Sequence, residues 1–212
     1  MHITVFGATG MVGKQVVLLG LARGFSITAF GRNINDLLDK ESHDGHFKAM
    51  KGYVFDATDV QRALVHADAV ISVLGGDFSG ADKTRSLGMK NIVEQMQKTN
   101  CKRIVALGGM GILDDKHGEY LLNAPDYPEE YKPVGREHLE AYQYLQASTL
   151  NWSFVCAPNI IDAGMDGKYI TSASHTPEPN LYKISSGNLA DCMISEITHP
   201  KYIHQRIGIS NS

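Results

Sequence analysis

The stretch that decides the fold is Val5-Phe6-Gly7-Ala8-Thr9-Gly10-Met11-Val12-Gly13-Lys14, close to the start of the sequence. An apolar run leads into three glycines with the spacing G-x-x-G-x-x-G, and a helical pattern of apolar residues follows at once. A strand, a glycine turn and a helix in this order are typical of a site that binds dinucleotide phosphates. Gly7 suits the tight turn, Gly10 lets a pyrophosphate approach the backbone, and Gly13 lets the helix pack closely on the sheet. A glycine turn without a ligand is the alternative, and the position of the motif in the first strand–helix unit disfavours it.

Composition describes an ordinary globular chain and excludes several classes of partner. The 212 residues are 43% hydrophobic and 20% charged, with a net charge of -3, so we expect one domain over residues 1–212 and no nucleic-acid or membrane partner. The first strand begins near residue 3 and no apolar run is long enough to span a bilayer, which predicts a cytoplasmic protein. Cys101, Cys156 and Cys192 lack paired spacing and are expected to be buried reduced thiols.

Strand and helix patterns alternate along most of the chain, which predicts the α/β class with a single doubly wound parallel sheet of the Rossmann type. The expected strands cover 2–6, 25–30, 51–55, 69–74, 102–107 and 152–157, and the expected helices cover 11–23, 59–66, 85–99 and 135–148. A hairpin-like segment over 168–184, a helix over 187–198 and a strand over 206–210 follow. We expect residues from about 160 to 212 to form a small C-terminal cap on the substrate side.

Five strand ends should point to one edge of the sheet, where open α/β sheets bind ligands. Three of these ends carry glycines, which fits a dinucleotide that lies across them. The residues expected to contact this cofactor are Gly7, Thr9, Gly10, Met11, Val12, Gly13, Arg32, Asp56, Ala57, Leu74, Gly75, Gly76, Gly108, Gly109, Met110, His138, Pro158, Asn159 and Ile160.

Arg32 follows the second strand, 19 residues after the last motif glycine. A dinucleotide fold presents the residue that reads the adenosine ribose at about this place, and an acidic residue there would repel a 2′-phosphate. A guanidinium pairs with phosphate instead, so Arg32 predicts NADP in preference to NAD. A solvated turn arginine is the alternative.

Two further sets of polar residues have weaker interpretations. Asp56 ends the expected third strand and could reach the adenine amino group, or it could cap the following helix. His43 and His46 lie in a polar loop without a third ligand nearby, so we predict no metal site.

These residues resemble the short-chain dehydrogenase/reductase superfamily, in its atypical branch of small NAD(P)-binding proteins. The closest character is that of biliverdin reductase B-type flavin reductases and their uncharacterised bacterial relatives. The resemblance covers essentially the whole chain and rests on Gly7-Ala8-Thr9-Gly10-x-x-Gly13, Asp56, Val73-Leu74-Gly75, Trp152-Ser153-Phe154-Val155-x-x-Pro158, Lys183-Ile184-Ser185 and Asn188-Leu189-Ala190-Asp191.

The sequence departs from that superfamily at its catalytic positions. The resemblance implies a Tyr and a Lys four residues apart, and by register on Leu145 and Pro158 those positions hold Val134 and His138. Gly108-Gly109 also replaces the serine or threonine expected after the fifth strand. Carbonyl or alcohol chemistry with a tyrosine acid is therefore unsupported.

The predicted function is hydride transfer from NADPH to a flavin, a quinone or a similar planar acceptor, for which the protein mainly binds and orients two rings. His138 is the candidate catalytic residue, because an imidazole of ordinary pKa could hold the nicotinamide ribose or relay a proton. A helix-surface histidine is its alternative. Asn159, and Tyr127 and Tyr131 from the irregular stretch 112–134, are the candidate acceptor-binding residues.

Two other functions remain open at this point. A nicotinamide-binding sensor without turnover would also lack the Tyr-Lys pair. An epimerase or dehydratase is weaker, because such an enzyme needs the catalytic tyrosine and a sizeable substrate domain. A small-molecule acceptor is the expected partner, in a monomer or homodimer.

Overall fold

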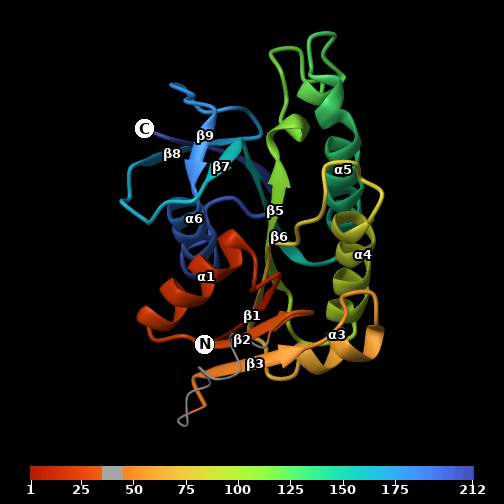
Figure 1. The fold of residues 1–212 in the computed structure, drawn as a ribbon, viewed down its shortest axis with the longest axis vertical. Helices are drawn as coiled ribbons and strands as arrows, with labels where there is room; N and C mark the ends of the chain where they lie inside the picture. The colour runs from red at the N-terminus through yellow and green to blue at the C-terminus, as the bar shows by residue number, and fades with distance from the viewer. Residues whose placement is uncertain (35–44) are drawn as a thin grey trace.

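The computed structural model describes residues 1–34 and 45–212, and in them strands and helices alternate around one large sheet (Figure 1). The strands are β1 (His2–Phe6), β2 (Ser26–Gly31), β3 (Phe47–Lys51), β4 (Ala69–Ser72), β5 (Arg103–Gly109), β6 (Asn151–Ala157), β7 (Asn159–Ile161), β8 (Tyr169–Ala173), β9 (Lys183–Ser185) and β10 (Gln205–Asn211). The α-helices are α1 (Met11–Ala22), α3 (Ala57–Ala63), α4 (Thr84–Gln97), α5 (Lys132–Gln146) and α6 (Ser186–Thr198). Short 3-10 turns are η1 (Met110–Ile112), η2 (Leu121–Asn123) and η3 (Glu129–Tyr131).

The large sheet has eight strands in the order β3-β2-β1-β4-β5-β6-β10-β8. Every neighbouring pair is parallel except β10 with β8, which is antiparallel. The chain runs outward from β1 in one direction and then returns to build the other half from β4. This order confirms the predicted doubly wound α/β fold, and it places a crevice beside β1 where the direction reverses.

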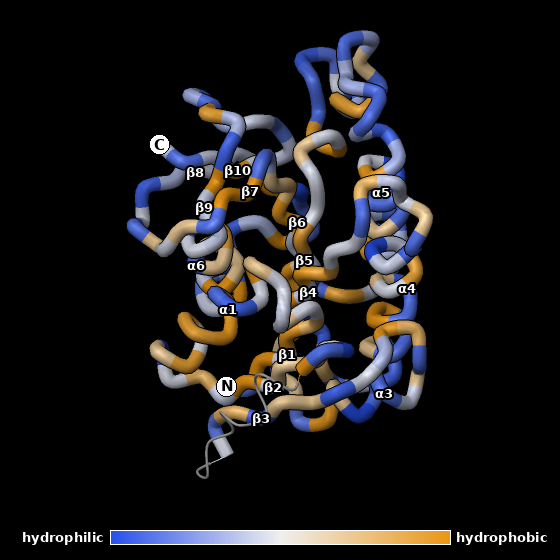
Figure 2. The backbone as a smooth tube through the Cα atoms, in the orientation of Figure 1, coloured by the Kyte–Doolittle hydropathy of each residue, from blue (hydrophilic) through white to orange (hydrophobic). Residues whose placement is uncertain are grey.

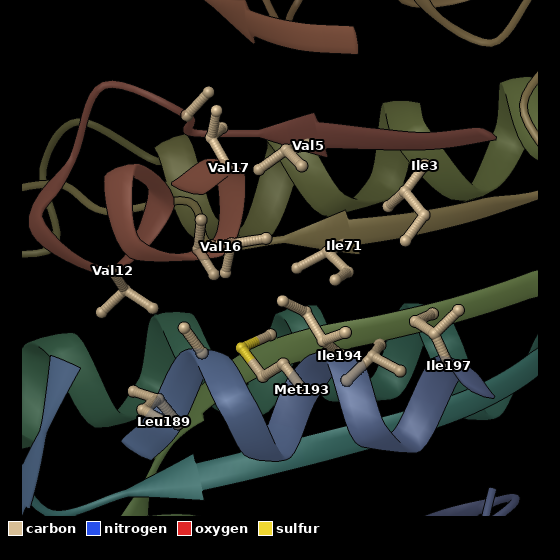
Figure 3. Close-up of a cluster of buried hydrophobic side chains, with 14 of the residues drawn as sticks. Ile3, Val5, Val12, Val16, Val17, Ile71, Leu189, Met193, Ile194 and Ile197 are labelled. Atoms are coloured by element: carbon tan, nitrogen blue, oxygen red, sulfur yellow. The ribbon is translucent and has the colours of Figure 1, made fainter. Parts of the chain in front are cut away.

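Helices cover both faces of the sheet, with α1 and α6 on one side and α3, α4 and α5 on the other (Figure 1). Alternate residues of β1 therefore enter two cores: Ile3 and Val5 pack towards α1 and α6, and Phe6 packs towards α3 and α4. Figure 3 shows Val12 and Val16 of α1 facing the apolar side of α6.

The hydropathy of the chain follows this layering. In Figure 2 the inner strands are largely hydrophobic, while the loops above α5 are mostly hydrophilic. Strands that are covered on both faces lose the polar alternation of a half-exposed strand. Cys101, Cys156 and Cys192 are buried free thiols, as the sequence predicts.

The third strand lies earlier than expected. We predicted a strand over 51–55, but β3 is Phe47–Lys51, with the alternate side chains of Phe47 and Ala49 buried. Gly52 follows the strand and packs against the ring of Phe30. A Cβ on Gly52 would lie 2.4 Å from Cε2 of that ring, so only glycine fits there without a shift. The more apolar residues after Gly52 belong to the turn that leads into α3 and not to the strand.

The C-terminal segment is built differently from a simple cap. Residues 168–184 do not form a hairpin, because β8 pairs with the open edge of β10 while β9 pairs with β7. The helix α6 packs on α1, and β10 extends the large sheet. Ile160 and Tyr182 are the members of this segment that reach the ligand cavity described below. Most of residues 160–212 therefore completes the core of the fold.

Candidate functional site

A cavity of about 760 Å³ opens along the carboxyl edge of the large sheet. The residues that line it follow each of the strands from β1 to β6, as the crevice rule for open α/β sheets predicts. The predicted site residues that line it are Gly7, Thr9, Gly10, Met11, Val12, Arg32, Leu74, Gly75, Gly108, Gly109, Met110, Tyr127, Tyr131, His138, Pro158, Asn159 and Ile160. Gly13, Asp56, Ala57 and Gly76 are not among the lining residues.

The glycine turn after β1 has the steric demands that its sequence indicates. Gly7 has a φ of +85°, and a Cβ there would lie 2.6 Å from the carbonyl oxygen of Val73. A Cβ on Gly13 would lie 2.2 Å from the carbonyl oxygen of Gly7, so Gly13 serves the turn without reaching the cavity. Gly10 is exposed and meets no such obstacle, which leaves its surface open to a ligand.

The N-terminus of α1 is free to bind an anion. Its N-cap residue is Gly10, which supplies no side-chain hydrogen bond, and its first turn carries no acidic residue. Met11 and Val12 of this turn line the cavity, so the unpaired N–H groups and the positive end of the helix dipole lie beside it. This arrangement fits the pyrophosphate of a dinucleotide.

Arg32 lies at the end of β2, beside the glycine turn. It is exposed and lines the cavity next to Gly31, where a Cβ would lie 3.6 Å from the side chain of Thr9. Of the described residues that line the cavity, none is an aspartate or glutamate, so a phosphate near Arg32 meets no opposing carboxylate in the wall.

Asp56 caps the helix that follows it, which is the second of its two predicted roles. Its Oδ1 accepts a hydrogen bond from the N–H of Asp59 at 3.0 Å, which caps α3. Asp56 and Ala57 lie outside the cavity lining because β3 ends at Lys51. Tyr53, Val54 and Phe55 line the cavity in their place.

His138 reaches the cavity from α5, above the end of β5. The imidazole packs directly on Gly109. A Cβ on Gly109 would lie 2.8 Å from Cδ2 of His138, so a larger residue at position 109 would clash with the ring. The half-buried ring has no hydrogen-bond partner at its buried Nδ1. Burial, with a smaller effect from the charge of Arg85, lowers the pKa of His138 to about 3. The imidazole is therefore neutral at physiological pH, and the expected proton relay at ordinary pKa is not supported.

Aromatic side chains gather in the cavity wall near the start of α5. The ring centroids of Phe78 and Tyr131 are 6.2 Å apart, and both residues are exposed. The hydroxyl of Tyr127 lies against Gly111 and Gly135, where a Cβ would meet it at 2.5 Å and 3.6 Å respectively. These contacts bring the irregular segment before α5 into the cavity wall, and acceptor binding by Tyr127 and Tyr131 stays a prediction.

Several lining residues were not predicted from the sequence. They are Phe30, Gly31, Gly52, Tyr53, Val54, Phe55, Val73, Phe78, Thr84, Arg85, Leu107, Gly111, Val134, Gly135, Ala157 and Tyr182. The strand-end members among them follow from the sheet-edge rule once β3 is placed correctly. Phe78, Arg85 and Tyr182 come from loops and a helix end whose path only the tertiary structure supplies.

Residues 1–34 and 45–212 contain no group of three or more His, Cys, Asp or Glu residues that could hold a metal ion. His43 lies outside the described residues, and His46 lies within hydrogen-bond distance of the hydroxyl of Ser26, at 3.2 Å. The helices in the described part of the chain are all too short or too polar to cross a membrane.

A family model described as NAD(P)H-binding matches residues 7–200. The chain belongs to this NAD(P)H-binding family. Its cofactor is therefore a nicotinamide dinucleotide, and the free end of α1 beside Gly10 fits the pyrophosphate of that group.

Relatives and solved structures agree with this membership over the full chain. The uncharacterised protein YwnB of Bacillus subtilis is 23% identical over 217 residues, which cover 99% of this chain and 98% of that protein. A structure from Streptococcus pneumoniae, named as a "putative NADH-flavin reductase", is 26% identical with a TM-score of 0.84 and 100% coverage of both chains. One from Bacteroides thetaiotaomicron, named as a "putative epimerase", is 27% identical with a TM-score of 0.85, over 99% of this chain and 96% of that one. The expected likeness to Rossmann-fold NAD(P)-binding reductases is confirmed.

Proposed function

We propose that this protein is an NADPH-dependent oxidoreductase that transfers hydride to a flavin, a quinone or a similar planar acceptor. The observation that carries the proposal is the division of the cavity. One end combines the glycine turn with the free N-terminus of α1, and the other combines the neutral His138 with exposed aromatic rings. The first end suits a dinucleotide, and the second suits a flat acceptor that needs no charged acid.

The preference for NADPH rests on Arg32. Its guanidinium stands at the end of β2, where a 2′-phosphate on the adenosine ribose would lie, and the described cavity wall contains no acidic residue to oppose that phosphate. The streptococcal neighbour is named for NADH, so the preference is a property to be measured on this chain.

The chemistry follows from the groups that face the nicotinamide end. Bound NADPH supplies a hydride, and acceptors of the flavin and quinone type take it without a protein acid. Val134 is buried and apolar where the superfamily carries its tyrosine, and the low pKa of His138 keeps its ring neutral. The residues of this chain therefore orient two rings and exclude water, and solvent delivers any proton that the product needs.

Three side chains of the cavity lining suit the task of holding the rings. Asn159 lines the cavity just after β6, where its amide can bond the nicotinamide carboxamide or the acceptor, and its backbone N–H donates to the carbonyl of Tyr182 at 3.3 Å. Tyr131 and Phe78 are exposed and line the cavity, and aromatic rings favour offset contacts with other π-systems.

The direct test is steady-state NADPH oxidation with two panels of acceptors. We expect protein-dependent oxidation with flavins and quinones, faster with NADPH than with NADH, and none with simple aldehydes and ketones. Turnover limited to the carbonyl panel would overturn the proposal, because it would require an acid that the cavity does not provide.

A nicotinamide-binding sensor is the second candidate, and the apolar Val134 is the observation that favours it. Tight NADPH binding without oxidation by any acceptor would support the sensor and exclude the reductase. The epimerase named among the neighbours is a weaker candidate, because Val134 cannot act as an acid or base.

We infer that the protein acts in the cytoplasm on a small-molecule acceptor. Three buried free thiols fit a reducing compartment, and NADPH is supplied there. A monomer or homodimer is our prediction for the assembly, and sedimentation of the purified protein measures it.

A further inference from the structure

Arg85 is a buried cation in the wall of the cavity. It lies in the first turn of α4 and is only 9% exposed. Its Nη1 donates to the carbonyl of Asp77 and its Nη2 to the carbonyl of Gly76, each at 2.9 Å. Within residues 1–34 and 45–212, no carboxylate forms an ion pair with this guanidinium. A buried charge that bonds only neutral carbonyls is an unusual arrangement, because buried charges are normally paired.

The carboxylates nearest to Arg85 are engaged elsewhere. Glu137 is 1% exposed, and it accepts hydrogen bonds from Nζ of Lys83 at 2.6 Å and from the hydroxyl of Ser86 at 2.7 Å. Asp82 accepts the backbone N–H groups of Asp77 and Thr84, each at 3.1 Å. Asp77 in turn accepts from the hydroxyl of Ser79 at 2.5 Å. These acids stabilise the loop and the start of α4, and their charges act on Arg85, but none of them forms an ion pair with the guanidinium.

The position of Arg85 in α4 adds to the free-energy cost of burying its positive charge. The first turn of a helix is the positive end of its dipole, and this turn contains no acidic residue to offset the charge. Loss of water around the guanidinium on burial lowers the pKa of Arg85, and the charges of Asp82, Glu137 and Asp77 offset only part of this shift. An arginine remains protonated in such a place. An anion that enters the cavity would therefore compensate the guanidinium for the water that it lost on burial.

Arg85 lies at the proposed acceptor end of the cavity, because its guanidinium donates to the carbonyl of Asp77, the residue before Phe78. Arg85 and His138 both line the cavity. Arg32 lies after β2 on the other side of β1, beside the place expected for adenosine. Arg32 and Arg85 are the arginines among the described lining residues, and these residues include no lysine. The cavity thus offers one cation at each end.

We propose that Arg85 binds an anionic group, a phosphate or a carboxylate, carried by the acceptor. The inference rests on the proposed function and narrows it: the natural acceptor is a planar ring system with an anionic substituent. Arg85 acts as a specificity-determining residue, since its planar fork can bond two oxygens of such a group.

FMN and riboflavin test this proposal, because they share one ring system and differ in a phosphate. In steady-state NADPH oxidation we expect KM for FMN to lie roughly tenfold or more below that for riboflavin, the effect of one charge-assisted hydrogen-bonded pair. Arg85→Gln should abolish this preference while leaving the Kd for NADPH unchanged. Arg85→Lys should keep part of it, and Arg136→Gln, which removes an exposed arginine of α5 outside the cavity, should keep all of it.

Two results would overturn the proposal. Equal KM values for FMN and riboflavin in the native protein would show that the phosphate is not read. A weaker Kd for NADPH in Arg85→Gln, with the FMN preference intact, would assign Arg85 to the cofactor pyrophosphate. Arg85→Lys is the control for folding, because it keeps the charge that bonds the carbonyls of Gly76 and Asp77. It should keep the thermal midpoint of the native protein, which would show that the loop remains folded.

The anion site can still be tested if the protein does not oxidise NADPH with any acceptor. Flavin fluorescence can then measure binding of FMN and riboflavin to the NADP-loaded protein without any turnover. FMN binding that is tighter than riboflavin binding and is lost in Arg85→Gln would support the anion site alone. Absence of FMN binding, or binding indifferent to Arg85, would refute it.

Discussion

At the scale of single residues, His138 connects the chemistry of the site with the stability of the protein. Its imidazole covers Gly109 and has no partner at its buried Nδ1, so protonation would place an unpaired proton at that nitrogen. A pKa of about 3 in the folded protein, against 6.5 for an ordinary histidine, means that the folded state favours the neutral ring.

This pKa predicts two pH dependences. Turnover should show no ionisation of His138 between about pH 6 and pH 8, so a step near pH 6.5 that disappears in His138→Gln would contradict this prediction.

The stability contributed by the neutral ring is complete above pH 6.5 and is lost as the pH falls towards 3. His138→Gln should therefore lose less stability than the native protein between about pH 7 and pH 5, measured by urea unfolding.

Arg32 carries the prediction about cofactor preference. Arg32→Glu should weaken NADPH binding by about 10- to 100-fold, the usual worth of a hydrogen bond to a charged group, and should affect NADH much less. Isothermal titration with both nucleotides measures this ratio. Arg136→Glu makes the same charge change on an exposed face of α5 and should leave the ratio unaltered. An unchanged ratio in Arg32→Glu would show that another residue reads the 2′-position.

Residue patterns predicted much of the cofactor half of the site and less of the acceptor half. Gly7, Gly10 and Arg32 lie within one strand–helix–strand unit, where spacing along the chain fixes position in space. Arg85 and Phe78 belong to the loop and helix start after β4, and no local pattern shows that they face a cavity. The pKa of His138 depends on burial under neighbours far away in sequence, so the ordinary value assumed for it could not hold.

At the scale of the elements, the packing of α1 on the glycine turn depends on the absence of one methyl group. A Cβ on Gly13 would lie 2.2 Å from the carbonyl oxygen of Gly7 and 2.7 Å from Cα of Ala8. Both contacts are with backbone, which cannot rotate away as a side chain would.

Gly13→Ala should therefore displace the N-terminus of α1, destabilise the fold by about 2 kcal/mol and weaken NADPH binding. Gly164→Ala is the matched control, because a Cβ on Gly164 meets nothing within 4 Å. Urea unfolding and nucleotide titration measure the two effects. Native affinity and stability in Gly13→Ala would contradict the steric reading of the motif.

The segment after β5 is tied to the C-terminal strand by Arg206. Its guanidinium donates to both carboxylate oxygens of Asp114, at 2.8 Å and 2.7 Å, and lies over the ring of Tyr120. This pair is mostly buried, so removing one partner leaves the other charge without compensation.

Arg206→Met should cost about 3 kcal/mol of unfolding free energy, whereas Lys90→Gln, which breaks an exposed pair with Glu94, should cost less than about 0.5 kcal/mol. Chemical unfolding of both variants makes the comparison. Equal losses would show that Arg206 does not anchor the segment.

The elements themselves were largely predictable, and the exceptions have one cause. Long periodic segments such as α4 and α5 follow the sequence pattern to within a few residues. The strand β3 was misplaced because Phe47–Lys51 alternates with lysines, while the more apolar residues 53–55 turn away to cover α3 and the cavity. The 168–184 hairpin failed because β8 found a better partner in β10, a choice that local propensity does not contain.

At the scale of the whole molecule, one sheet edge collects residues from most of the chain into a cavity of two parts. We assign the residues after β1 and β2 to the cofactor part and the residues after β4, β5 and β6 to the part for the proposed acceptor. Doubly wound topology predicts this division from the order of the elements alone. The identity of the acceptor depends on side chains that the topology does not specify, which is why function could be predicted only as a reaction class.

The proposed reaction is transfer of a hydride from NADPH to a planar ring in this cavity. Single-turnover kinetics detect that transfer, with protein in excess over NADPH, FMN as acceptor and oxygen excluded. We expect loss of the NADPH absorbance in one phase, and a slower phase when the transferable hydrogen at C4 of the nicotinamide is deuterium. Bound NADPH whose absorbance does not change with FMN, riboflavin or a quinone would contradict it and leave a nicotinamide-binding protein without turnover.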